Sequence, residues 1–300
     1  MNTPVYIAID QPLDLGTTLN SGQCFRWRSE PDGLWLGVLG PDVVRLWMYG
    51  DTLGIESAPA APGDMVEEIT AYLRLDDDLP TIQKGLSSDA HVNEGIRRYP
   101  GLRLLRQDPW ETLATFILSS VSNIPRISRT VELIATTLGE PVALDRTYRH
   151  TFPGPERLAA VDEAELRRLG CGFRAPYLLR AAQDVASGAL RLGQLRGLPY
   201  AETLPLLTAL HGVGEKVADC VMLFALDRME AFPVDRWVQR AVAQWYGVRS
   251  RRYGDVRDWA WEHFGAHAGY ANQYLFWNAR QQRRDQAAEG DRSSRSDPEA

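Results

Sequence analysis

Cysteine is scarce in this sequence of 300 residues, which contains only Cys24, Cys171 and Cys220. An odd and widely scattered set does not build a disulfide framework, and this favours an intracellular location over a secreted one. Histidines are also few, and their spacing matches no metal-ligand pattern: they are His91, His150, His211, His263 and His267. We therefore expect no catalytic metal.

Long hydrophobic runs are missing as well. No stretch of roughly 18 apolar residues occurs, so we expect no membrane-spanning helix. The first apolar residues, Val5 to Ile9, follow no basic region, and the sequence therefore predicts no signal peptide. The net charge of −6 leaves nucleic-acid binding open, because affinity for phosphates depends on local charge rather than on the total.

The most distinctive segment that is present is Leu210-His-Gly-Val-Gly-Glu-Lys-Val-Ala-Asp-Cys220. Apolar spacing predicts a short helix over 201–210, with Pro205 tolerated in its first turn, and a second helix over 216–226. Gly212 and Gly214 allow a positive φ in the tight connection around Val213, and they let backbone N–H groups approach an anion. A backbone phosphate of nucleic acid is the natural anion for such a hairpin.

Two ionisable residues follow the glycines. Lys216 falls in the first turn of the second predicted helix, where an amine that is partly desolvated becomes a nucleophile. Asp235 follows Pro233 and precedes another apolar-periodic run, so it is a favoured N-cap. A chain returning to this cap would bring the carboxylate to the amine, and this makes the two residues a candidate catalytic pair. Taken singly, two glycines before a helix are often only a turn, and a lysine in a first helical turn is usually a solvated surface residue.

Together, these residues resemble the helix–hairpin–helix DNA glycosylase superfamily, and specifically the 8-oxoguanine DNA glycosylases. In that family the hairpin lysine attacks the sugar and the aspartate assists. The resemblance covers residues 10–280 in patches and is most specific at 210–237. Iron–sulfur members of the superfamily carry four closely spaced cysteines near the C-terminus, and none follows Cys220 here. The resemblance therefore implies no iron–sulfur cluster, and we expect no cofactor.

The resemblance also implies a reader for the damaged base. Residues 19–27 are similar to the Ser-Gly-Gln-x-Phe-Arg-Trp segment of these glycosylases. There the glycine carbonyl accepts a hydrogen bond from N7–H, the proton that distinguishes 8-oxoguanine from guanine. On that resemblance Gly22 is the lesion reader, whereas from local sequence alone it is a hairpin glycine.

The rest of the base pocket is implied by residues 269–277, which resemble the final helix of the family. That helix supplies a glutamine to the Watson–Crick edge and a phenylalanine that stacks on the base. Phe276 matches the phenylalanine, and Cys220 matches the residue on the opposite face of the base. The glutamine position holds Asn272 with Gln273 beside it, so the choice between the two amides stays open.

The junction at 119–126 corresponds to the family segment that enters the duplex and reads the orphaned cytosine through an asparagine and an arginine. Arg126 matches the arginine. The asparagine position holds Val121, and Asn123 is a partial substitute. Selectivity for the opposite base therefore stays open.

A second loop is predicted to contact DNA. Its glycines at 170 and 172 make a tight turn that displays Phe173 and Arg174. A base-flipping enzyme needs an aromatic or apolar wedge, and a guanidinium offers paired donors to an exposed base. The family has tyrosine in place of Phe173, and by composition alone Phe173 is equally a core residue. Trp237 stands where the family has a histidine that touches a phosphate.

For the fold, aromatic and β-branched runs at 24–28, 35–39 and 43–48 predict an antiparallel sheet of about five strands. Helical periodicity begins near residue 65, and Asp108 with Pro109 opens a long helix. We therefore expect an α+β protein. Its parts are an N-terminal β domain with connecting helices over 1–100, a helical glycosylase domain over 101–280 and a disordered polar tail over 281–300.

The combined prediction is a base-excision-repair glycosylase that removes 8-oxoguanine from duplex DNA and nicks the strand through Lys216. The partner is double-stranded DNA, no membrane is involved and the expected state is a monomer in the cytoplasm or the nucleus. One alternative is a glycosylase for an alkylated purine, against which Lys216 argues because such relatives lack the lysine. The other is a non-catalytic helix–hairpin–helix module, which has no use for Asp235.

Overall fold

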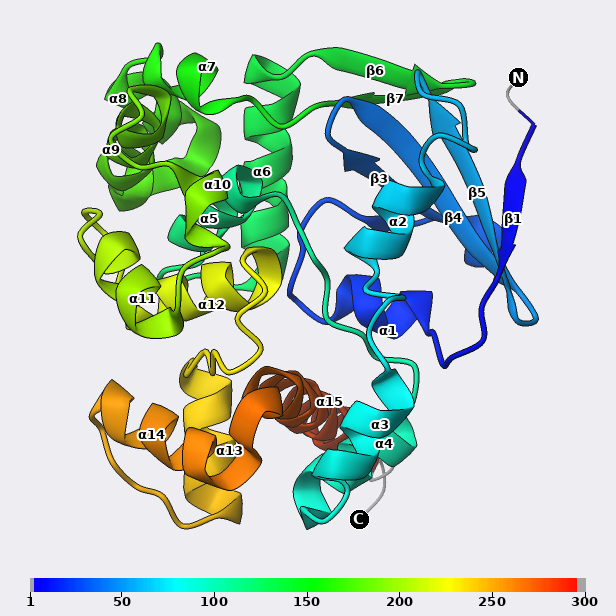
Figure 1. Ribbon diagram of the computed structural model, residues 1–300, viewed down its shortest axis with the longest axis vertical. Helices are drawn as coiled ribbons and strands as arrows, with labels where there is room; N and C mark the ends of the chain where they lie inside the picture. Colours follow the sequence, from blue (N-terminus) through cyan, green and yellow to red (C-terminus); the bar gives the residue numbers. More distant parts are fainter. Residues whose placement is uncertain (1–2, 296–300) are drawn as a thin grey trace.

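The N-terminal runs form a five-stranded antiparallel sheet in the computed structural model, which describes residues 3–295 (Figure 1). The strand order is β1-β5-β4-β3-β2. Its strands are β1 Val5–Ala8, β2 Arg28–Ser29, β3 Trp35–Leu39, β4 Asp42–Tyr49 and β5 Thr52–Ala58. The predicted sheet is confirmed, but the strand expected over 24–28 is wrong except at Arg28. Residues 23–27 form a loop because Gln23 is bonded to the 103–107 segment, accepting from the Leu105 N–H at 2.9 Å.

Two helices, α1 Leu15–Asn20 and α2 Val66–Tyr72, cover one face of this sheet (Figure 1). Alternate residues of the strands, such as Leu53 and Ile55, point into the core that these helices close. A small hairpin of β6 Pro141–Leu144 and β7 Thr147–His150 reaches across from the helical part and packs Leu144 against the sheet. The sequence reading missed this hairpin.

The remaining chain is helical and builds the larger core. Its helices are α3 Leu79–Leu86, α4 Ala90–Arg98, α5 Pro109–Ile117, α6 Ile124–Leu138, α7 Pro155–Ala159, α8 Glu163–Leu166, α9 Ala175–Ala186, α10 Leu192–Leu195, α11 Tyr200–Thr208, α12 Glu215–Ala225, α13 Arg236–Trp245, α14 Tyr253–Phe264 and α15 Ala268–Arg295. The α+β class is thereby confirmed. Both α3 and α4 contribute to this larger core rather than to the core under the sheet.

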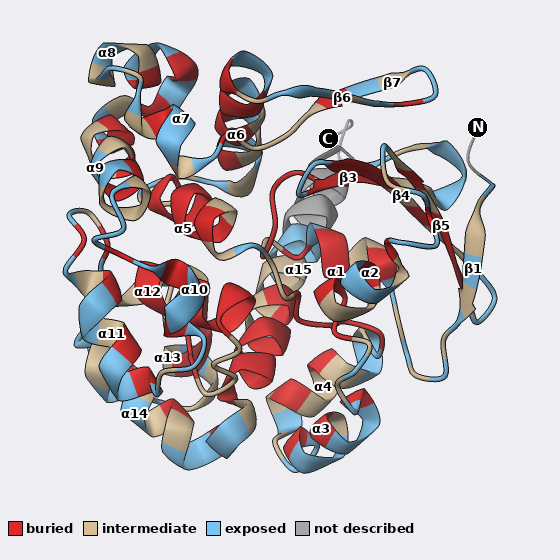
Figure 2. Ribbon diagram, turned by 45° about the horizontal axis from the view of Figure 1, so that its top comes forward, coloured by how far each residue is buried: buried red, intermediate tan, exposed pale blue. Residues whose placement is uncertain are grey.

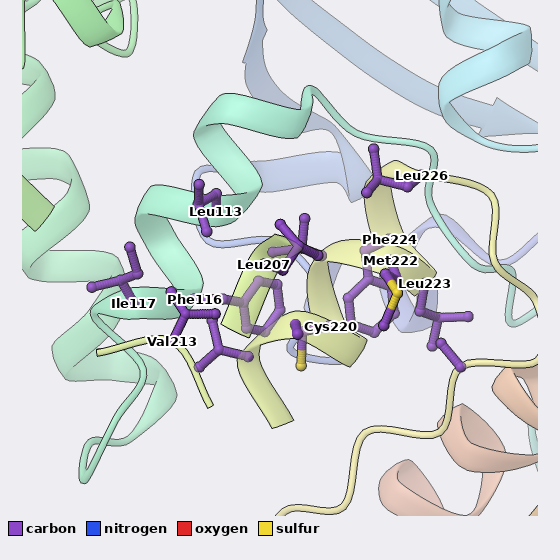
Figure 3. Close-up of a cluster of buried hydrophobic side chains, with 14 of the residues drawn as sticks. Leu113, Phe116, Ile117, Leu207, Val213, Cys220, Met222, Leu223, Phe224 and Leu226 are labelled. Atoms are coloured by element: carbon purple, nitrogen blue, oxygen red, sulfur yellow. The ribbon is translucent and has the colours of Figure 1, made fainter. Parts of the chain in front are cut away.

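Helix α12 lies at the centre of the helical part. Every residue from Val217 to Ala225 is buried, as expected for a helix that is surrounded on all sides (Figure 2). Phe116 of α5 stacks on Phe224 of α12 with ring centroids 5.6 Å apart, and Val213 packs into the same cluster (Figure 3). The second helix of the hairpin is therefore held firmly by the core.

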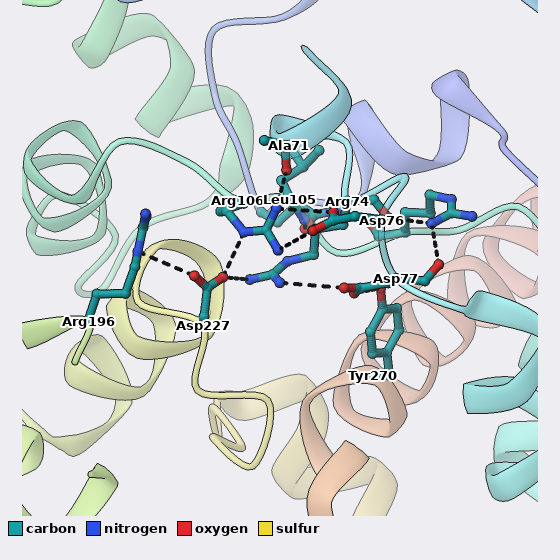
Figure 4. A network of polar contacts seen from close by, with 11 residues as sticks. Ala71, Arg74, Asp76, Asp77, Leu105, Arg106, Arg196, Asp227 and Tyr270 are labelled. Carbon is teal, nitrogen blue, oxygen red and sulfur yellow. Dashed lines mark hydrogen bonds and ion pairs between the residues drawn. The ribbon is translucent and has the colours of Figure 1, made fainter. Parts of the chain in front are cut away.

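An ionic cluster joins the end of α12 to the sheet side of the molecule (Figure 4). Asp227 accepts from Arg106 Nε at 2.9 Å, forms an ion pair with Arg196 at 3.3 Å and also binds Arg74. Arg74 is fully buried and lies near Asp77, to which Tyr270 of α15 donates a hydrogen bond of 2.7 Å. These contacts tie α2, α12 and α15 together.

Three expectations about helices need correction. Asp108 caps α5 as predicted, but α5 ends at Ile117 and is short, because a polar loop separates it from α6. Pro205 lies inside α11 rather than in its first turn, since that helix begins at Tyr200. The tail predicted over 281–300 is helical through Arg295, because α15 continues from its buried part, and Arg98 of α4 binds Asp285 at 3.2 Å. Residues 296–300 lie outside the described residues.

Across the described chain, no helix combines the length and apolarity needed to cross a membrane.

Candidate active site

A cavity of about 620 Å³ opens between α12, α13, the first turns of α15 and the loops at 22 and 119–125. The residues predicted for catalysis and base recognition line it together, although they come from distant parts of the sequence: they are Gly22, Lys216, Cys220, Asp235, Asn272, Gln273 and Phe276. Phe173, Arg174 and the hairpin glycines are not among its lining residues.

Lys216 reaches the cavity from the first turn of α12. Its Nζ donates to Ser119 Oγ at 3.0 Å and lies 5.0 Å from the centre of the Phe116 ring. The amine is thus half-buried between a hydroxyl and an aromatic face, with no carboxylate bonded to it in the described chain. Such an amine is free to meet an electrophile in the cavity.

Asp235 enters the cavity as the N-cap of α13, which confirms its predicted structural position. One carboxylate oxygen accepts from the Trp237 N–H at 2.8 Å and from the Val238 N–H at 2.9 Å. Burial raises the pKa of Asp235, while the Val238 N–H and the charge of Lys216 oppose that rise. A carboxylate held in this way is oriented by the helix and still has capacity to stabilise a positive charge.

Gly22 must be glycine for two reasons. Its φ is +83°, and a Cβ at this position would approach Ile124 Cδ1 to 2.6 Å and Phe276 Cε1 to 3.4 Å. Any side chain would therefore intrude between Ile124 and Phe276 on the cavity wall. This leaves the backbone of Gly22 exposed to whatever occupies the cavity.

The two amides on α15 each hold one wall of the cavity. Asn272 Nδ2 donates to the Pro233 carbonyl at 3.1 Å, next to Asp235, and Gln273 Nε2 donates to the Ser21 carbonyl at 3.2 Å, next to Gly22. Both side chains are almost fully buried. Each amide therefore orients a backbone segment of the site, a role that the sequence reading did not assign.

Cys220 and Phe276 supply apolar surface. Burial raises the pKa of Cys220 to about 12, against the opposing charge of Lys216, so the thiol is neutral at physiological pH. A planar, uncharged base fits between a thiol and an aromatic ring better than a charged group does.

The two loops predicted to enter DNA lie side by side. Phe173 is 49% exposed, as expected for a wedge, but Arg174 is 3% exposed and is not displayed. Arg174 Nε donates to the Ser120 carbonyl at 2.6 Å and Nη2 donates to the Val121 carbonyl at 2.9 Å. The predicted display of Arg174 is wrong because two carbonyls, more than fifty residues away in sequence, bind its guanidinium.

Val121 forms the tip of the neighbouring loop. It is 77% exposed and has a φ of +51°, which is rare for a β-branched residue. Asn123 accepts from the Arg126 N–H at 3.0 Å and caps α6, so its carbonyl oxygen is already used. Asn123 lines the cavity and is exposed, and Arg126 is exposed but is not among the lining residues.

The hairpin matches the prediction in shape and differs in detail. Gly212 has a φ of +85°, and a Cβ would lie 2.3 Å from Tyr177 Cγ, so glycine is required there. Gly214 caps α12 with a φ of −93°, and a Cβ there would meet nothing within 4 Å, so the positive φ expected at both glycines occurs only at Gly212. Val213 is buried and its N–H donates to the Leu210 carbonyl at 3.1 Å, so it presents neither a side chain nor a free donor.

Sequence reasoning missed two contributors to the cavity. Ser119 positions the amine, and only the polar end of α5 hinted at it. Arg280 lines the cavity and has an Nη1 that is buried without a partner. Its position four residues after Phe276, on the same helix face, is the signal that identifies it.

Comparison with known proteins identifies the family to which this chain belongs. Residues 6–113 match the family model for the 8-oxoguanine DNA glycosylase N-terminal domain, and residues 114–265 match the model for HhH-GPD superfamily base excision DNA repair proteins. The chain belongs to the HhH-GPD superfamily.

Individual relatives support this placement. The chain is 31% identical over 282 residues to the N-glycosylase/DNA lyase OGG1 of Arabidopsis thaliana, covering 88% of this chain and 76% of the relative. It superposes on MBOgg1 in complex with a low-affinity DNA ligand with a TM-score of 0.90 and 37% identity, covering 94% of this chain and 97% of that one. Against the Clostridium acetobutylicum 8-oxoguanine glycosylase/lyase with DNA containing cytosine opposite 8-oxoG, the TM-score is 0.89 at 30% identity, covering 94% and 98%. These HhH-GPD structures match both the sheet and the helical part.

Proposed function

We propose that this HhH-GPD protein removes 8-oxoguanine from duplex DNA and then nicks the strand through a Schiff base on Lys216. The observation that carries the proposal is the cavity that gathers the Lys216 amine and the Asp235 carboxylate with the backbone of Gly22 and the ring of Phe276. The Clostridium acetobutylicum structures named 8-oxoguanine glycosylase/lyase share this fold over nearly the whole chain.

In the proposed mechanism, the damaged nucleotide turns out of the duplex while Phe173 fills the gap. The base enters between Cys220 and Phe276, and the Gly22 carbonyl accepts from its N7–H. As the glycosidic bond breaks, the bonding electrons leave with the base and Asp235 stabilises the positive charge that develops on the sugar.

Strand nicking follows from the amine. The nitrogen lone pair of Lys216 forms a bond to C1′ and the amine loses a proton, which gives an imine once the sugar ring opens. Loss of a proton from C2′ then forms a C2′–C3′ double bond and breaks the C3′–O bond, and the phosphate leaves with that electron pair as the 5′-phosphate end of the downstream strand. A binding-only module does not need this pair.

Because all of these groups come from one chain, we further infer that the protein acts as a monomer, in the compartment that holds the DNA.

Borohydride trapping tests the proposal. The substrate is a duplex with one 8-oxoguanine placed opposite each of the four bases in turn, and Lys216→Gln is the control. We expect a covalent adduct with the wild-type protein and none with Lys216→Gln, which should retain DNA binding. Base release without an adduct would contradict the lyase step. Absence of both would contradict 8-oxoguanine as the substrate, and loss of DNA binding in Lys216→Gln would make Lys216 a phosphate contact.

A further inference from the structure

Asp219 is a fully buried carboxylate on the catalytic helix, yet it does not line the cavity. It lies between Lys216 and Cys220 in sequence but on the side of α12 that faces α11 and α14. Its Oδ1 accepts from the Tyr200 hydroxyl at 2.6 Å and its Oδ2 accepts from the Tyr253 hydroxyl at 2.5 Å. Burial of a carboxylate is unfavourable unless such donors are present, so both tyrosines are needed where they are.

Tyr253 has a second partner, and this partner leads to the active site. Its oxygen accepts from the backbone N–H of Val234 at 3.2 Å. A hydroxyl has one proton and two lone pairs, so Tyr253 donates to Asp219 and accepts from Val234 at the same time. A continuous chain of hydrogen bonds therefore runs from α12 through the start of α14 to the residue next to Asp235.

The two proposed catalytic groups are otherwise attached to different elements. Asp235 is bonded to the first turn of its own helix, α13, and Lys216 is bonded to Ser119 at the end of α5. No ion pair joins Asp235 to Lys216 directly in the part of the chain that the structure describes. Their separation therefore depends on what fixes residues 233–235 relative to α12.

We propose that Asp219 and Tyr253 are positioning residues that fix the Pro233–Asp235 segment against α12 and so set the separation between the Asp235 carboxylate and the Lys216 amine. The Asp219–Tyr253–Val234 bridge holds one side of this segment, and Asn272 holds the other side through the Pro233 carbonyl. Displacement of a reacting group by about 1 Å reduces a rate by roughly a hundredfold, which is why such a bridge matters. The catalytic consequence rests on the proposed function, whereas the bridge itself does not.

Tyr253→Phe tests the bridge, and Tyr200→Phe is its matched control. Each change removes one hydroxyl that donates to Asp219 and keeps the ring, but only Tyr253→Phe also removes the acceptor of the Val234 N–H. The first measurement is amide hydrogen exchange at Val234 and Asp235. The second is the single-turnover rate of 8-oxoguanine excision, measured together with DNA affinity and with borohydride trapping on a duplex that already contains an abasic site.

We expect Tyr253→Phe to accelerate exchange at Val234 by roughly tenfold and to slow excision by roughly tenfold to a hundredfold. DNA affinity and trapping on the abasic duplex should change little, because neither needs Asp235 in place. Tyr200→Phe should leave Val234 exchange and excision near the wild-type values. Equal losses in the two variants, or unchanged Val234 exchange in Tyr253→Phe, would overturn the proposal. If the wild-type protein excises nothing, the proposed function fails, while the exchange comparison still decides whether the bridge holds the segment.

Discussion

Two aspartates in the connection between α12 and α13 have opposite electrostatic surroundings. Asp227 meets the guanidinium groups of Arg74, Arg106 and Arg196 (Figure 4). Burial pulls the pKa of Asp227 upward, but these three charges outweigh it and the pKa is lowered. Asp235 has two backbone N–H groups, the Lys216 amine and the charge of Arg236, and there burial still prevails and the pKa is raised.

The difference distinguishes a structural ion cluster from the site proposed to be reactive. The cluster around Asp227 satisfies its charge within the protein, so the carboxylate is already stabilised and gains little from another cation. Asp235 is incompletely compensated, so a cation that forms in the cavity gains more from it. A perturbed pKa identifies a functional carboxylate only when the partners that perturb it are counted.

The largest expected effect is on excision. Asp235→Asn removes the charge but keeps a good N-cap for α13, so the fold should persist. We expect the excision rate to fall by roughly a hundredfold to a thousandfold, because the sugar cation loses its counter-charge. Single-turnover kinetics on 8-oxoguanine duplexes measure this. In the wild type, the rate should also decline as pH falls through the raised pKa of Asp235. A rate within about threefold of wild type would contradict the assigned role.

Removing the charge of Asp227, by contrast, should affect stability rather than excision. Asp227→Asn leaves Arg74 buried without its main partner, and we expect unfolding to become easier by about 3 kcal/mol at pH 7. Because the pKa of Asp227 is lowered, its contribution is present above the ordinary aspartate range and disappears as pH falls through the lowered pKa. Denaturant unfolding at several pH values measures this. Asp258→Asn, which breaks an exposed pair with Arg257, is the control and should shift stability by less than about 1 kcal/mol.

Asp219 extends the comparison to a carboxylate with hydroxyl partners. Burial raises its pKa from 3.8 to about 6, while Tyr200 and Tyr253 oppose the rise, with Arg257 and Glu215 as the nearby charges. The folded protein therefore binds a proton more readily than the unfolded chain, so the stability that this group contributes falls as pH rises from about 4 to about 6. We expect the difference in unfolding free energy between the wild type and Asp219→Asn to fall by up to about 3 kcal/mol across that window. A stability difference that does not change with pH would show that folding leaves the pKa of Asp219 unchanged.

The smallest expected effect concerns the opposite base. Val121→Asn places an amide at an exposed position whose φ of +51° suits asparagine better than valine. We expect the preference for cytosine opposite the lesion to rise by roughly threefold to tenfold, measured as the ratio of excision rates over the four partners. Val121→Gly relieves the same backbone strain without an amide. The interpretation fails if both variants change the ratio equally.

Local chemistry made much of this structure predictable. Asp108 and Asp235 cap helices as their neighbours in sequence indicate, and Gly212 adopts the positive φ that its motif requires. Alternating apolar residues indicated the sheet, although the loop at 23–27 has strand-like residues and is held instead by Gln23.

Long-range contacts account for what sequence reasoning missed. Arg174 follows a tight turn as expected, but the carbonyls that bind it lie in another loop, and no local pattern reveals such partners. Asn272 and Gln273 are neighbours in sequence and still bind opposite walls of the cavity, because α15 passes between those two walls. The expected domain boundary near residue 100 remains a prediction, while α3 and α4 pack into the larger core.

The burial of α12 from Val217 to Ala225 has a consequence for how this scaffold changes over time. Substitutions along Val217–Ala225 disturb a close-packed core, so most of them lower stability before they can alter chemistry. The exposed loop around Val121 carries no such penalty and still reaches the cavity rim. New substrate preferences are therefore expected to arise at the rim, while the helix that carries the proposed nucleophile stays constant.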